Sequence, residues 1–132
     1  EAYSAGSHPN GKVNPHALAL LSRLNYSTQG LRSKSWDEFA APDAPHMDFI
    51  FTVCASAAGE ACPIWPGHPT TAHWGIADPA HVEPLAARRE AFATAYRQLA
   101  RRIGAFVVLP LETLSAQEIA AAARRIHEEG EA

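Results

Sequence analysis

The stretch from Asp48 to Cys54, Asp-Phe-Ile-Phe-Thr-Val-Cys, constrains the fold of this chain more than any other. Its middle lacks the alternation of polar and apolar residues that is typical of a strand with one solvent-exposed face. A continuous apolar run of this length is typical of a strand buried on both faces in a parallel sheet. We therefore expect an α/β protein in which Cys54 stands at the carboxyl end of a buried strand.

Strand and helix signals alternate around this run, which favours a parallel sheet with helices packed on it. The elements that we predict, in chain order, are a strand ending over residues 2–5, a helix over 14–24, a short turn over 35–39, a strand over 48–54, a weakly helical segment over 55–61, a strand over 71–75, and helices over 85–106 and 115–128.

Capping residues set the starts of three of these segments. Asn14-Pro15 combines an N-cap with a proline in the first turn, and Ser35 is placed to cap the short turn. Ser115-Ala-Gln-Glu118 has the capping-box pattern. In the long helix, one face is predicted to be apolar through Leu85, Phe92, Tyr96, Leu99, Ile103 and Phe106. The other faces are expected to meet water through Arg88, Arg89, Arg97 and Arg101.

Composition narrows the classes of function. The chain has 132 residues, enough for one core, with 47% hydrophobic and 19% charged residues and a net charge of -3. No basic stripe interleaved with aromatic residues is present, so nucleic acid is not an expected partner. The apolar runs are shorter than the roughly 20 residues that a membrane helix needs. A cytoplasmic location is the expectation.

The two cysteines, Cys54 and Cys62, are the first candidates for chemistry. Two cysteines do not make a disulfide framework, so in a reducing compartment they are free thiols, ligands or redox groups. Thiols eight residues apart, joined by a small-residue loop, are suited to thiol–disulfide exchange, in which one thiolate attacks and the other resolves. The alternative is that each is a small buried apolar residue.

Asp78-Pro79 is the second candidate, since a carboxyl group near a thiol site can act as a general acid. The alternative is ordinary turn chemistry, for which Asp-Pro is well suited. A zinc site made of Cys54, Cys62, His68 and His73 is a further alternative, but the cysteines lack the close spacing of most structural zinc sites.

Five segments together resemble one family. Tyr3-Ser-Ala-Gly6, Asn14-Pro15, Phe51-Thr-Val-Cys54, Cys62-Pro63 and His73-Trp-Gly-Ile-Ala-Asp-Pro79 resemble the low-molecular-weight tyrosine phosphatase family, and in particular its arsenate reductase branch. The resemblance implies a phosphatase I-like three-layer sandwich, with a small parallel sheet flanked by helices. The family-like domain would span residues 1–110, and residues 111–132 would be a C-terminal helical extension.

The resemblance also implies a function, arsenic detoxification by reduction of arsenate to arsenite through a thiol relay. A first cysteine attacks arsenate with help from the acid, here Asp78. A second thiol, here Cys54, releases arsenite, and a third, here Cys62, closes a disulfide with the second. An external thiol reductant then reopens the disulfide: thioredoxin, glutaredoxin or a low-molecular-weight thiol. No bound cofactor or metal is implied.

One family element has no counterpart in these residues. The family's nucleophile lies in a Cys-x5-Arg loop, whereas the residues six positions after Cys54 and Cys62 are Glu60 and His68. We expect the N-terminal strand-loop-helix to be absent from this chain. The chain would then be inactive alone, and whether it is an enzyme stays open. A missing central strand would leave two unpaired edges, which a homodimer or an exchanged strand would cover.

Two other functions stay open at this point. The first is a phosphatase-like hydrolase of the same family. Such an enzyme needs no thiol relay, so the presence of Cys62 argues against it. The second is a non-catalytic truncated module for redox sensing or dimerisation, which the chain would be if no nucleophilic loop accompanied it.

Overall fold

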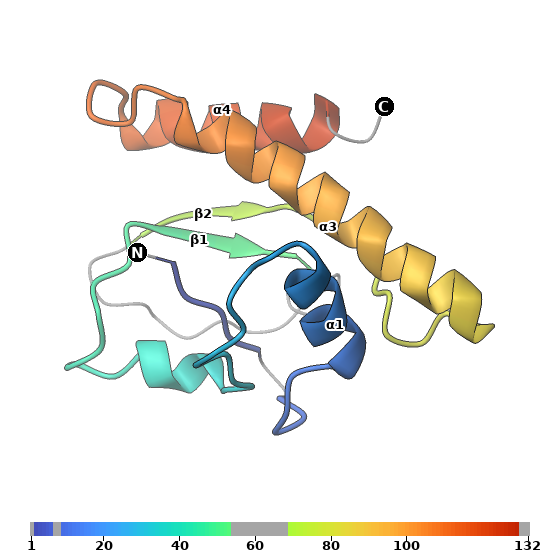
Figure 1. The fold of residues 1–132 in the computed structure, drawn as a ribbon. Coiled ribbons are helices and arrows are strands. Elements are labelled where there is room, and N and C mark those ends of the chain that lie inside the picture. The colour runs from blue at the N-terminus through green and yellow to red at the C-terminus, as the bar shows by residue number, and fades with distance from the viewer. Residues whose placement is uncertain (1, 7–8, 54–68, 130–132) are drawn as a thin grey trace.

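The computed structural model describes residues 2–6, 9–53 and 69–129. Its elements in chain order are α1 (Pro15–Arg23), the 3-10 helix η1 (Trp36–Phe39), β1 (Phe49–Thr52), β2 (Thr70–His73), α3 (Leu85–Val107) and α4 (Ala116–Glu129). Figure 1 shows α4 and the C-terminal part of α3 above the two strands in that view, with α1 and η1 below them. The predicted α/β class is confirmed as a mixed α/β fold around a small parallel sheet.

The two strands pair in parallel, as the apolar run predicted. Phe49 lies opposite Thr70, and Thr52 lies opposite His73. The ladder continues beyond the strands, because Trp74 N donates to Thr52 O at 2.7 Å. Parallel strands end at the same edge of a sheet, so the chain leaves β1 and β2 side by side.

The strand that we predicted over residues 2–5 is wrong. Residues 2–5 are exposed and have no strand partner in the described part of the chain. The nearest feature is an isolated parallel bridge between Gly6 and Ser35, in which Gly6 N donates to Lys34 O and Trp36 N donates to Gly6 O, each at 3.0 Å. A strand exists only where a neighbouring ladder satisfies its backbone groups, and here one bridge does so.

The three predicted capping arrangements are confirmed. The side chain of Asn14 accepts a hydrogen bond from His16 N at 2.9 Å, and Ser35 Oγ accepts one from Asp37 N at 3.1 Å. Before α4, Glu118 N donates to Ser115 Oγ at 3.1 Å, and Ser115 N donates to Glu118 Oε1 at 2.9 Å. These bonds satisfy backbone donors that a helix start leaves without partners.

The core lies where β2, α3 and α4 meet. Its buried residues are Trp74, Phe106, Ile119 and Ala123, which we call the Trp74 core. Phe51 of β1 stacks on Trp74 with ring centroids 4.0 Å apart, and Trp74 Nε1 donates to Ala123 O at 2.9 Å. The indole therefore packs in the core, and its polar N–H has a partner as burial requires.

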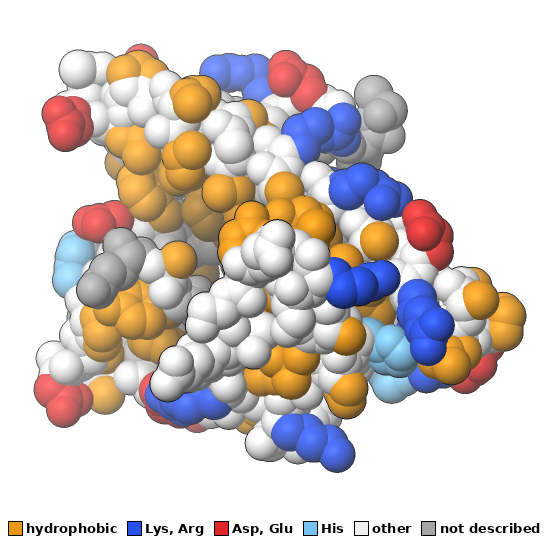
Figure 2. Space-filling view, viewed as in Figure 1, with side chains coloured by type: hydrophobic (Ala, Val, Ile, Leu, Met, Phe, Trp, Pro, Cys, Tyr) orange, Lys and Arg blue, Asp and Glu red, His pale blue; other side chains and the backbone are white. Residues whose placement is uncertain are grey.

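The predicted apolar face of α3 is only partly right. Phe106 is buried, but Leu85 and Ile103 are about half exposed and Arg102 is 1% exposed. Leu85 is exposed because only the C-terminal half of this long helix meets the strands and α4 (Figure 1), and within that half Arg102 takes a buried position that we had not predicted, while Ile103 stays outside. On the face shown in Figure 2, acidic and apolar side chains lie between the Lys and Arg side chains.

The structure also bears on the membrane question. None of the helices in the described ranges is long and apolar enough to cross a bilayer.

Candidate functional site

The candidate site is the sheet edge where β1 and β2 both end. Val53 O, after β1, accepts a hydrogen bond from Ile76 N, after β2, at 2.8 Å. Val53 immediately precedes Cys54, and Ile76 stands two residues before Asp78. The backbones leading to the predicted thiol and to the predicted acid are thus bonded to each other. Cys54 and Cys62 themselves lie outside the described residues, so their roles stay predictions.

Asp78 lies on the loop that follows β2, and its side chain is exposed. Asp78 Oδ1 accepts a hydrogen bond from Ala80 N at 2.9 Å, which closes a turn of the kind that Asp-Pro favours. The turn that we held as the alternative for this residue is therefore present. It engages one carboxylate oxygen and leaves the other available to a ligand, so the turn and an acid role are compatible.

A hollow of about 320 Å³ lies beside this loop. Asp78, Pro79 and Val82 form its loop side. Helix α3 forms the other side with Ala87, Glu90, Ala91, Thr94, Ala95 and Gln98. The loop therefore runs along α3, with this hollow between them.

Arg102 of α3 anchors the start of this loop. Its guanidinium Nη1 donates to Trp74 O at 3.1 Å and to Gly75 O at 3.0 Å. The Nε atom of Arg102 is buried and has no hydrogen-bond partner. Sequence reasoning missed this residue. The signal was available, because Arg102 stands three residues after Leu99 and four before Phe106, on the apolar face of the helix.

Arg88, at the other end of α3, anchors the end of the same loop. Its Nε donates to Val82 O at 3.0 Å, and its Nη2 pairs with Glu83 Oε1 at 2.6 Å. The Arg88 side chain is about a quarter exposed, so the expectation that it merely faces water is wrong. The segment between Trp74 and Glu83 is thus held to one helix at both ends.

His73 and Gly75 fix the exit of β2. Thr52 Oγ1 and His73 Nδ1 share a hydrogen bond of 2.8 Å across the two strands. A Cβ atom on Gly75 would lie 2.8 Å from His73 Nε2, closer than side-chain packing allows, so glycine is needed there. Of the four ligands of the zinc alternative, His73 alone is described. No group of three or more metal-ligating side chains occurs among the described residues.

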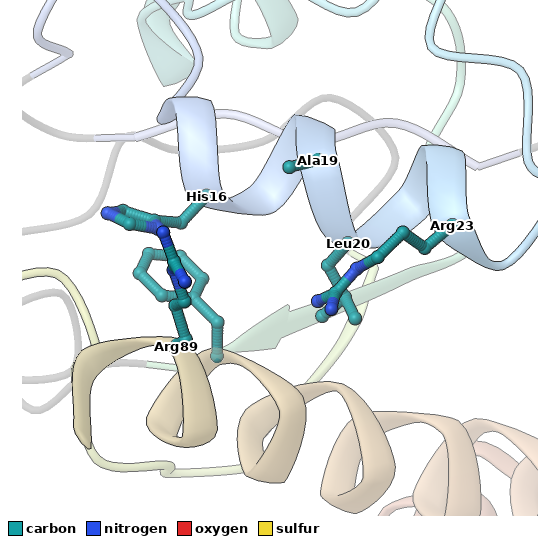
Figure 3. Close-up of a pocket in the computed structure, with 6 residues that line it drawn as sticks. His16, Ala19, Leu20, Arg23 and Arg89 are labelled. Carbon is teal, nitrogen blue, oxygen red and sulfur yellow. The ribbon is translucent and has the colours of Figure 1, made fainter. Parts of the chain in front are cut away.

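A second hollow, of about 260 Å³, lies between α1 and α3. Figure 3 shows the side chain of Arg89 reaching from α3 toward His16 on α1, with Leu20 and Arg23 further along α1. The described side chains around it include neither a thiol nor a carboxylate. We do not include it in the site, because none of the residues that line it belongs to the ends of β1 and β2 or to the loop that carries Asp78.

The structure defines a mixed α/β protein with a candidate site at the end of a parallel sheet, and comparison with known proteins identifies the family. The profile of the low molecular weight phosphotyrosine protein phosphatases matches residues 1–120. The chain belongs to this family.

Curated relatives named arsenate reductase are similar to this chain. That of Shouchella clausii is 32% identical over 83 residues, which are 63% of this chain and 56% of that protein. That of Bacillus licheniformis is 32% identical over 106 residues, 79% of this chain and 72% of that protein. That of Bacillus subtilis is 30% identical over 92 residues, 70% of this chain and 63% of that protein. The chain thus spans little more than half of the first relative's length.

Proposed function

We propose that this chain carries the later steps of arsenate reduction by a thiol–disulfide relay. Cys54 is the resolving thiol, Cys62 is the recycling thiol and Asp78 is the general acid. The observation that carries the proposal is the hydrogen bond between Val53 O and Ile76 N. It brings the backbone next to Cys54 beside the backbone that leads to Asp78. The similarity to proteins named arsenate reductase supports the same reading.

The proposed chemistry balances in three steps. A first thiolate attacks arsenate and forms an As–S bond while Asp78 gives a proton to the departing oxygen. The Cys54 thiolate then attacks that sulfur, the As–S electron pair stays on arsenic, and arsenite leaves. The Cys62 thiolate attacks Cys54, releases the first thiol and leaves a Cys54–Cys62 disulfide. A thioredoxin-like protein, glutaredoxin or a small thiol supplies the two electrons that reopen it.

The first thiol is a separate requirement. The relay needs three thiols, and the given 132 residues contain two and no Cys-x5-Arg loop. We propose that the nucleophile lies outside these residues and that the 132-residue chain alone does not turn over. The three-layer sandwich with a further central strand, supplied in the same chain or by a second copy, belongs to this proposal.

The test compares the full-length gene product with the 132-residue chain in arsenate reduction coupled to thioredoxin. We expect turnover by the first and none by the second; turnover by the short chain would contradict the missing-nucleophile proposal. After one turnover without reductant, mass mapping should find a Cys54–Cys62 disulfide. Cys62→Ser should instead stop after one arsenite per protein, with Cys54 joined to another cysteine.

A phosphatase-like hydrolase is the second candidate, and the match to the phosphotyrosine phosphatase profile favours it. Ester hydrolysis needs Asp78 as proton donor but no resolving thiol. The two functions therefore separate in a Cys62→Ala variant of the full-length protein. Efficient hydrolysis of aryl phosphates by that variant, together with no arsenate reduction by the wild-type protein, would favour the hydrolase. Loss of arsenate turnover would favour the relay.

A further inference from the structure

The geometry points to Arg102 as the residue that positions the Asp78 loop for proton transfer. This inference rests on the proposed function for the role of Asp78, and it adds a residue that does not itself touch the substrate. Arg102 lies on the adjacent helix α3 and acts through the backbone carbonyls of Trp74 and Gly75.

The contacts of Arg102 are directed at the beginning of the loop. One nitrogen, Nη1, donates to two successive carbonyl oxygens at 3.1 and 3.0 Å. Fixing two successive carbonyls defines the orientation of the peptide between Trp74 and Gly75. The next residue, Ile76, is bonded to Val53 at the strand edge, and Asp78 follows two residues later. Few backbone rotations therefore remain between the anchor and the acid.

The burial of Arg102 argues against a role in stability alone. Its side chain is 1% exposed, and no carboxylate of the described residues forms an ion pair with it. A buried cation without a counter-charge is costly, and the buried Nε without a partner adds to that cost. An apolar residue at this buried place on the helix would avoid both costs.

The far end of the loop supports the same reading. Arg88 binds Val82 O, so two arginines of α3 hold backbone carbonyls on either side of Asp78. They stand 14 residues apart, close to four helical turns, and so project from the same side of α3. The Asp78 turn lies between these two anchors in the chain, and the hollow beside it is lined on its other side by Ala91, Ala95 and neighbouring side chains of α3. A rigid helix thus sets the place of the acid.

Two substitutions of Arg102 differ in which of its properties they remove. A lysine at position 102 keeps the charge and offers three N–H groups to the two carbonyls, whereas a methionine keeps the length and loses every donor. Arg97 is a matched control on the same helix, because its side chain is 62% exposed and pairs with Glu90 on the surface.

The experiment measures single-turnover arsenate reduction by the full-length gene product, which removes the recycling steps from the rate. Arg102→Met should lower the maximal rate at least about tenfold, as expected when a reacting group is misplaced by about an ångström. Half-saturation by arsenate should stay within about twofold of wild type, because binding is not the step affected. Arg102→Lys should restore most of the rate, and Arg97→Met should match wild type.

A double-variant comparison separates positioning from a general loss of structure. In an Asp78→Asn background, Arg102→Met should lower the rate by less than about twofold, since residues that act as a unit are not additive. If the rate loss of the double variant equals the product of the losses of the two single variants, the inference is overturned. If Arg102→Met does not fold, Arg102→Gln, whose amide donates to one carbonyl, takes its place in the same comparison.

Amide hydrogen exchange gives a readout that does not depend on activity. The amides of Ile76, Ala77 and Asp78 should exchange at least about tenfold faster in Arg102→Met, with those of α4 unchanged. If the full-length wild type reduces no arsenate, the proposed function fails. The exchange measurement then tests by itself whether Arg102 anchors the loop. Unchanged exchange at residues 76–78 would overturn the inference even in an active enzyme.

Discussion

Two regions of this molecule use the same local signals but differ in what they bury. In the C-terminal region, which holds the Trp74 core, α4 alone contributes three buried residues, Ile119, Ala122 and Ala123. In the N-terminal region, residues 9–47, neither α1 nor η1 contains a buried residue. The N-terminal region meets α3 through contacts near the surface, such as the 2.9 Å bond between the hydroxyls of Tyr26 and Tyr96. Capping therefore places helices in both regions, whereas tertiary packing stabilises mainly one.

The largest expected effect is loss of the Trp74 side chain. Trp74→Ala should lower the free energy of unfolding by about 3–5 kcal/mol, since it leaves a cavity in the core. It also removes the donor to Ala123 O, which is then buried without that partner. The midpoint of urea denaturation, followed by far-UV circular dichroism, measures the change.

Trp36→Ala is the matched change in the N-terminal region, where the side chain is half-buried. Its cost should be clearly smaller, because less apolar surface leaves water at this position on folding. An equal or larger cost for Trp36→Ala would show that the N-terminal region shares the stability of the core, and the contrast between the two regions would then be wrong.

The fold was predictable where the sequence pattern matched a local cause. The caps at Asn14, Ser35 and Ser115, the parallel strand at Phe49 and the long helix ending near Phe106 follow from such patterns, and the structure contains them. The strand over residues 2–5 was not predictable in this way, because a strand depends on a neighbour that lies elsewhere in the chain.

Two of these caps, Asn14 and Ser115, provide the second prediction. Asn14→Ala and Ser115→Ala each remove one side-chain acceptor from a helix start, which costs about 1 kcal/mol of helix stability. We expect Ser115→Ala to lower the global unfolding free energy by that amount, because α4 belongs to the Trp74 core. Asn14→Ala should mainly speed amide exchange within α1, because a lightly packed helix opens locally. Equal global losses in the two variants would contradict the contrast.

The site was only partly predictable, and the reason lies in the side chains that serve it. Asp78 was recognisable from its motif, and the structure adds its turn to Ala80 N. Arg102 was not recognisable, because several arginines along a helix usually indicate a solvent-exposed face, and only the packing shows which of them is buried. Its position between Leu99 and Phe106 was the available sign.

The smallest expected effect concerns two exposed glutamates, one in each region. Hydrogen bonds from the Ser115 backbone and side chain lower the pKa of Glu118 below its ordinary value of 4.5. A hydrogen bond from Arg32 likewise lowers the pKa of Glu38. A carboxyl whose pKa is lower when folded contributes stability above its unfolded pKa and loses it as the pH falls through the folded value. Both contributions should therefore decline as the pH falls below about 4.5 and disappear once the pH lies below the folded pKa values.

The contrast between the regions predicts which glutamate matters for global unfolding. Urea midpoints measured from neutral pH to below pH 4.5 should depend less on pH in Glu118→Gln than in wild type. Glu38→Gln should leave that dependence nearly unchanged, because the ion pair of Glu38 with Arg32 is exposed and weak. Added salt should reduce any contribution of Glu38 and leave the capping bond of Glu118 in place, because screening acts on the exposed pair. A larger effect from Glu38 would mean that the N-terminal region unfolds together with the Trp74 core.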